Sequence, residues 1–181
     1  MVYGHARHID DMGRPLGAYP TQAPNTPVEE FSKGCFICQP TVVMRRSFLI
    51  LNGPLDENLR TAFDFDWWLR AFGRFPDRIT FIEAVQAESR LHAACITLNQ
   101  RRTVALEALQ LLRHHLGYAP NHWIKTWVIE ALQSGEVRSA HDVLVQDVLA
   151  QARQYLEPDD WFELQQWLVE EANTRTKFLE E

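Results

Sequence analysis

Residues 63–70 read Phe-Asp-Phe-Asp-Trp-Trp-Leu-Arg and place two carboxylates in an aromatic stretch. As a helix, this stretch brings Asp66 within one turn of Arg70 and leaves Asp64 on another face. The helix dipole stabilises a carboxylate in the first turn, so Asp64 is expected to be ionised near neutral pH and to suit a general base. The 3.6-residue period also predicts one apolar face, formed by Phe65, Leu69 and Phe72.

The same residues also fit an ordinary structural explanation. Acidic residues at helix starts commonly cap the helix, and a tryptophan pair such as Trp67 and Trp68 is usually part of a core. The stretch alone therefore leaves a catalytic and a structural Asp64 both open.

The elements that would position this helix come from both sides of it. Residues 2–4 are expected to form a strand, and residues 9–16 a hairpin in which Gly13 takes a positive φ. Three prolines predict an irregular loop over residues 19–27, which is either a mobile cover or a plain connector. The apolar and β-branched content of residues 31–44 predicts a buried strand with Pro40 at an edge or bulge, and residues 79–85 predict another strand.

Four blocks in this order carry a resemblance: Cys-Phe-Ile-Cys-Gln-Pro at 35–40, Arg-Arg at 45–46, Gly-Pro-Leu-Asp-Glu at 53–57, and the acidic helix start that ends in Trp-Leu-Arg. Together they resemble the second half of an inverting family 2 glycosyltransferase domain of the GT-A fold, over about residues 2–116. The resemblance implies that Asp64 is the base that deprotonates the acceptor hydroxyl. It also places Gln39, Trp67 and Asp66 on the acceptor side. One departure is Phe63, where the family commonly has glutamate.

Arg90-Leu91-His92 resembles the Arg-x-His loop that follows the catalytic helix in this family. The resemblance implies that Arg90 and His92 approach the donor diphosphate, whose negative charge grows as it departs. A structural alternative pairs Arg90 with Glu88 and leaves His92 exposed. Arg45 and Arg46 could likewise reach a phosphate, although we favour the start of a short helix.

Metal binding by this chain is not expected. Cys35-x-x-Cys38 and His92-x-x-Cys95 supply four zinc-type ligands, but bulky residues fill the first pair and no knuckle glycine follows it. The Asp-x-Asp pattern at 64–66 opens a helix, whereas the family's ion-binding motif follows a strand. By resemblance, the complete enzyme uses Mg or Mn, held with the nucleotide sugar by an N-terminal βαβ half. Nothing before Val2 supplies that half, so we expect an acceptor half.

Residues beyond Thr103 predict helices throughout, over 104–116, 123–132, 140–156 and 161–178, with stops near Gly117, Gly135 and Pro158. Acidic residues beside the tryptophans of the last helix argue against membrane-surface binding by that helix. We expect these helices to pack on the preceding domain or to self-associate.

Composition and net charge limit the classes of partner and the cellular location that are expected for this protein. The chain has 181 residues, 46% of them hydrophobic, and a formal net charge of -6, which argues against a nucleic-acid partner. No apolar run is long enough for a membrane span, the first five residues have no signal-peptide character, and three cysteines suit a reducing compartment. We expect a cytoplasmic protein, either free or peripheral at the inner face of the membrane.

These observations predict a mixed α/β fold, with a partial GT-A-like domain over residues 1–102 and an all-helical extension over 103–181. The expected function is sugar transfer with inversion from a nucleotide sugar to a hydroxyl of a glycan or lipid-linked acceptor, in cell-envelope polysaccharide biosynthesis. The alternative is a non-catalytic binding module derived from a truncated glycosyltransferase.

Overall fold

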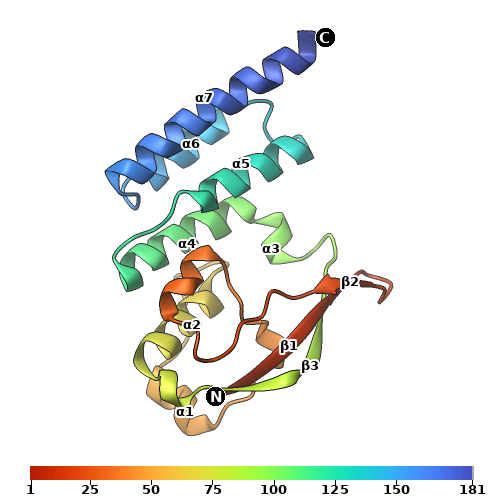
Figure 1. The fold of residues 1–181 in the computed structure, drawn as a ribbon, viewed down its shortest axis with the longest axis vertical. Helices are drawn as coiled ribbons and strands as arrows, with labels where there is room; N and C mark the ends of the chain where they lie inside the picture. Colours follow the sequence, from red (N-terminus) through yellow and green to blue (C-terminus); the bar gives the residue numbers. More distant parts are fainter. Residues whose placement is uncertain (181) are drawn as a thin grey trace. The chain divides into compact units, whose positions relative to one another are not determined.

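The computed structural model describes the backbone of residues 1–180 and the side chains of residues 1–172. The chain forms two compact units, Met1–Gln100 and the helical part that begins at Arg101, whereas the sequence places the boundary between residues 102 and 103. The fold is mixed, with a small sheet and many helices (Figure 1). A GT-A-like architecture remains a proposal.

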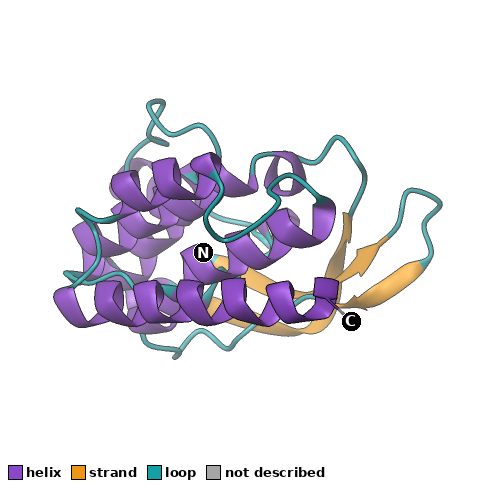
Figure 2. Cartoon of the chain, turned by 90° about the horizontal axis from the view of Figure 1, so that it is seen from above, coloured by secondary structure: helices purple, strands orange, loops and turns teal. Residues whose placement is uncertain are grey.

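The first unit contains a three-stranded sheet, whose strands are orange in Figure 2. The order of the strands in this sheet is β2-β1-β3. Its strands are β1 (Val2–Ile9), β2 (Pro15–Ala18) and β3 (Thr80–Arg90). β1 and β2 form the predicted antiparallel hairpin, and Gly13 has a φ of 81°, which confirms both predictions. Asp10 stabilises the turn because its Oδ1 accepts hydrogen bonds from the N–H groups of Met12 and Arg14.

β3 runs parallel to β1, from the pair Val2 and Thr80 to the pair Ile9 and Arg90, with irregular register around His5. At Gly4 the two strands approach closely. A Cβ there would lie 2.8 Å from the carbonyl oxygen of Ile82 and 3.1 Å from that of Ala84, so the register requires glycine.

The predicted strand over residues 31–44 is wrong. This segment contains the 3-10 helices η1 (Val28–Lys33) and η2 (Gln39–Thr41), and only an isolated bridge joins Val43 to Val2. Pro40 stands in the first turn of η2, where its missing N–H costs nothing. The apolar residues are nevertheless buried: Phe31, Phe36 and Ile37 are at most 1% exposed. The pattern therefore reported burial correctly but not the backbone conformation.

Two helices follow this segment, α1 (Arg46–Asn52) and α2 (Phe63–Arg74). The predicted apolar face of α2 is confirmed, since Phe65, Leu69 and Phe72 are all buried. The Phe31 ring stacks on Phe36, with centroids 4.1 Å apart, and meets the Phe72 ring edge-on at 5.1 Å. This aromatic cluster fixes the position of α2 in the unit. The 3-10 helix η3 (Pro76–Arg78) and the short helix α3 (Ile96–Asn99) precede and follow β3.

The second unit is helical, as predicted, with α4 (Arg101–Leu116), α5 (His122–Ser134), α6 (Val143–Ala152) and α7 (Pro158–Glu180). α5 ends at Gly135, which takes the left-handed conformation. α6 is shorter than the predicted 140–156, because Asp142 caps its first turn by accepting the N–H of Leu144. Among the residues that the structure describes, none of the helices has the length and apolar character that crossing a membrane requires.

Candidate functional site

Asp64 stands in the first turn of α2, two residues after the N-cap position. Ala62 occupies the N-cap position and offers no side-chain acceptor. The Asp64 carboxylate fills this gap, since its Oδ1 accepts the N–H of Phe65 at 2.8 Å. Among the described residues, no lysine or arginine pairs with Asp64. The carboxylate is therefore held by backbone donors and keeps acceptor capacity for another group.

Burial shifts the pKa of the Asp64 carboxyl. Desolvation raises the pKa of this carboxyl above its ordinary value, and the N–H groups of Phe65 and of Asp64 itself offset the rise only in part. The helix dipole favours the ionised form and burial opposes it, and the net shift of the Asp64 pKa is upward. A carboxylate with a raised pKa is a stronger base once it is ionised.

Tyr19 and Cys35, which the sequence did not connect with Asp64, lie near it. The Tyr19 hydroxyl donates toward the carbonyl oxygens of Cys35, at 3.3 Å, and Ile37, at 3.2 Å. Burial, reinforced by the Asp64 carboxylate, raises the pKa of the Cys35 thiol to about 12, and burial raises the pKa of Cys38 to about 11. Both thiols are therefore neutral near pH 7, which argues against a thiolate nucleophile.

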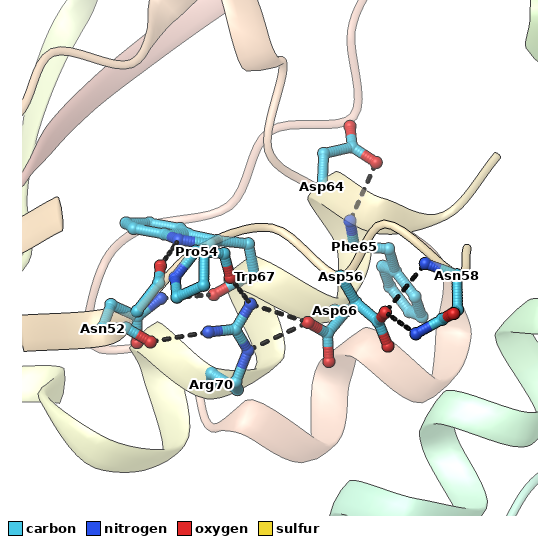
Figure 3. A network of polar contacts seen from close by, with 10 residues as sticks. Asn52, Pro54, Asp56, Asn58, Asp64, Phe65, Asp66, Trp67 and Arg70 are labelled. Carbon is cyan, nitrogen blue, oxygen red and sulfur yellow. Dashed lines mark hydrogen bonds and ion pairs between the residues drawn. The ribbon is translucent and has the colours of Figure 1, made fainter. Parts of the chain in front are cut away.

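Asp66 belongs to a different network, which ties α2 to the end of α1 (Figure 3). Its side chain is 10% exposed and receives the Arg70 guanidinium, whose Nε donates to Oδ2 at 2.9 Å. This confirms the predicted pair. Arg70 also donates to the carbonyl oxygens of Asn52, at 2.6 Å, and Pro54, at 2.8 Å.

Trp67 completes this connection. It is 2% exposed, its indole N–H donates to the carbonyl oxygen of Gly53 at 2.9 Å, and its own carbonyl accepts the Asn52 amide at 3.0 Å. Trp67 and Asp66 were expected to contact an acceptor. In this arrangement both are buried and committed to holding the 52–54 loop against α2.

The remaining predicted site residues lie on other elements. Gln39 is exposed at the start of η2, directly after Cys38. Arg90 ends β3, where its Nη1 donates to the carbonyl oxygens of Asp10 and Asp11, each at 2.9 Å. Glu88 pairs instead with Arg7, so the structural alternative for Arg90 named the wrong partner.

His92 is exposed, and its Nδ1 accepts the N–H of Ala94 at 3.2 Å. In a neutral ring, this bond leaves the proton on Nε2. Among the described residues, Nε2 has no hydrogen-bond partner.

The aspartates of α2 do not form a joint cation site. Figure 3 shows the Asp64 and Asp66 carboxylates directed to different sides of the helix. Among the described residues, no group of three or more histidine, cysteine, aspartate or glutamate side chains is placed to hold a metal ion. The residues present therefore do not fit the divalent cation that the resemblance implies for a complete enzyme.

No family model, curated protein or solved structure matches this chain.

Proposed function

We propose that the first unit is the acceptor side of an inverting glycosyltransferase, with Asp64 as its general base. The observation that carries the proposal is a half-buried helix-start carboxylate without a cationic partner among the described residues. Such a group is poised to accept a proton, because its raised pKa matches it better to a hydroxyl than an ordinary aspartate would be. The four-block resemblance supports the same assignment.

The proposed reaction is a single in-line displacement. Asp64 accepts the proton of the acceptor hydroxyl while the hydroxyl oxygen forms a bond to the anomeric carbon of the donor sugar. The bond from that carbon to the nucleoside diphosphate breaks, and its electron pair leaves with the diphosphate. Attack from the side opposite the leaving group inverts the configuration at the anomeric carbon.

The other residues take supporting roles in this proposal. Gln39, exposed after Cys38, orients the acceptor. Arg90 and His92 face the diphosphate: among the described contacts, Nε and Nη2 of Arg90 remain available to an anion. Asp66 and Trp67, which we first expected to touch the acceptor, position α2 and the 52–54 loop. No described residue of this chain is assigned to the nucleoside or to a cation.

The test is a transfer assay in which this sequence is joined to a nucleotide-binding half. Asp64→Asn keeps the size of the side chain but cannot accept the proton, so the transfer rate should fall by roughly 10²- to 10⁴-fold. Asp77→Asn, an exposed carboxylate beyond α2, is the matched control and should stay within a few-fold. If Asp64→Asn transfers within a few-fold of the wild type while it remains folded, the base assignment fails.

A non-catalytic binding module is the second candidate. It is favoured by the hydrogen bond that the Asp64 carboxylate accepts from the N–H of Phe65. Capping the start of the helix would be sufficient reason for an aspartate at this position. The two candidates differ in the transfer assay, because a capping role makes Asp64→Asn a change in stability without a specific loss of transfer.

A further inference from the structure

A cavity of about 900 Å³ opens in the first unit beside α1, away from the residues assigned to transfer. Its polar lining includes Arg45, Arg78 and Thr80, and its apolar lining includes Val43 and Phe48. Asp64, Gln39 and Arg90 take no part in it. The cavity is thus a separate feature with two cationic side chains over an apolar wall.

The arginines of the first unit differ in whether a carboxylate faces them. Arg7, Arg14 and Arg70 each pair with a carboxylate. Among the described residues, by contrast, Arg45 and Arg78 have no carboxylate partner, and no aspartate or glutamate lines the cavity. Two unpaired guanidinium groups at one cavity favour an anion, and the planar guanidinium matches phosphate oxygens in particular.

Aliphatic side chains are exposed next to these charges. Val43 is 67% exposed, Leu51 is 43% exposed, and Ile50 is 70% exposed. Val43 and Leu51 line the cavity, and Ile50 lies three residues after the lining residue Ser47, on the same side of α1. These exposed aliphatic side chains can contact the apolar part of a ligand, because removing apolar surface from water is favourable.

The charge distribution of the chain is compatible with an anionic ligand here. Residues 101–181 contain 13 of the 24 acidic residues but only 8 of the 18 lysines and arginines. The acidic excess therefore lies mainly outside the first unit, and interactions between exposed charges are screened over about 8 Å at physiological salt.

We propose that this cavity binds the phosphate group of an anionic lipid at a membrane surface. Arg45 and Arg78 hold the phosphate, and Val43, Ile50 and Leu51 contact the adjoining hydrocarbon. Basic side chains beside exposed aliphatic ones are the combination by which proteins bind at the interface of an anionic membrane. This inference does not depend on the transferase proposal, since it uses none of the residues assigned to transfer.

The experiment measures cosedimentation of the full chain with phosphatidylcholine vesicles, with and without phosphatidic acid. We expect binding only to the vesicles that contain phosphatidic acid. Arg45→Ala and Arg78→Ala should each weaken that binding about fivefold, the value of one basic residue at an anionic surface. Ile50→Ser should weaken it as well. All three residues are exposed, so circular dichroism should show an unchanged fold.

Arg46→Ala is the matched control, because Arg46 is exposed and adjacent to Arg45 but does not line the cavity. Its binding should stay within twofold of the wild type. An equal loss in Arg46→Ala and Arg45→Ala would indicate general charge attraction and overturn the site, as would equal binding to both vesicle types or no binding at all.

Monomeric decyl phosphate and inorganic phosphate, followed by NMR shifts around Arg45, separate the sources of the phosphate. A lipid site predicts weaker binding of inorganic phosphate than of decyl phosphate. Binding of decyl phosphate without any binding to vesicles would show a soluble ligand and overturn the membrane assignment.

Discussion

Two ion pairs, one from each unit, differ in the exposure of their carboxylates. In the first unit, the Arg70 side chain is 19% exposed and binds both the Asp66 carboxylate and two backbone carbonyl groups. In the helical unit, the Lys125 side chain is 18% exposed, but its partner carboxylate on Glu163 is 66% exposed, against 10% for Asp66. A buried pair leaves an uncompensated charge when one partner is lost, whereas an exposed pair is replaced by water. The Asp66–Arg70 pair therefore determines the position of a loop, whereas the Lys125–Glu163 pair is expected to contribute little.

The units also differ in what fills their interiors. The helical unit buries regular aliphatic stripes, including Leu109, Leu112 and Leu164, each 0% exposed. The first unit buries aromatic rings from irregular segments, such as Phe31 and Phe36, against α2. Irregular segments can carry polar groups to a site that a rigid element supports, and the candidate site lies in this unit.

The largest expected stability effect is a cavity in the helical unit. Leu112→Ala removes a fully buried side chain of α4 and should lower the free energy of unfolding by about 2–5 kcal/mol. Hydrogen exchange of peptides from α4 and α5 would measure this loss. Val169→Ala, at a position 53% exposed, is the control and should change stability by less than about 0.5 kcal/mol. Similar losses in the two variants would contradict the assigned core.

A smaller effect is expected from the buried pair of the first unit. Asp66→Asn keeps the shape of the side chain but removes the charge that faces Arg70, and it should cost about 1–3 kcal/mol. Hydrogen exchange in α1 and α2 would report the change, because Arg70 joins these helices. A cost below about 0.5 kcal/mol would mean that this pair behaves like an exposed one, and the contrast between the units would fail.

The pH dependence of stability tests the environment of Asp64. Because burial raises its folded-state pKa, the folded protein binds the proton more tightly than the unfolded chain does. The wild type therefore loses stability from this group as the pH rises through the interval between the ordinary pKa of 3.8 and the raised folded value. Asp64→Asn does not titrate, so its stability relative to the wild type should increase across this interval.

Denaturant unfolding at several pH values would measure this difference. A relative stability of Asp64→Asn that falls with rising pH would instead indicate a lowered pKa, as the helix dipole alone predicts.

The smallest effect is expected at the surface of the helical unit. Lys125→Ala removes the ion pair with Glu163 and should change the free energy of unfolding by no more than about 1 kcal/mol. The loss should shrink further at high salt, because exposed charges are screened. A loss as large as that of Asp66→Asn would remove the distinction drawn between the two units.

Local patterns were sufficient for much of the fold. The helical period located α2, α4, α5 and α7 with only small errors at their ends, and the turn residues around Gly13 located the hairpin. They failed at residues 31–44, where apolar side chains reach the core from 3-10 turns and coil. Short apolar runs indicate burial, but strand formation also requires a neighbouring strand in register, and local sequence does not specify one.

For the candidate site, the sequence by itself determined the aspartates at the start of a helix and the one-turn pairing of Asp66 with Arg70. Both follow from helix geometry within a few residues. Only the tertiary structure decided that Asp66 and Trp67 are buried, that Tyr19 and Cys35 lie near Asp64, and that the Asp64 pKa rises. The physical reason is that desolvation depends on atoms brought from distant parts of the chain, whereas the dipole and the i, i+4 pair arise within the helix.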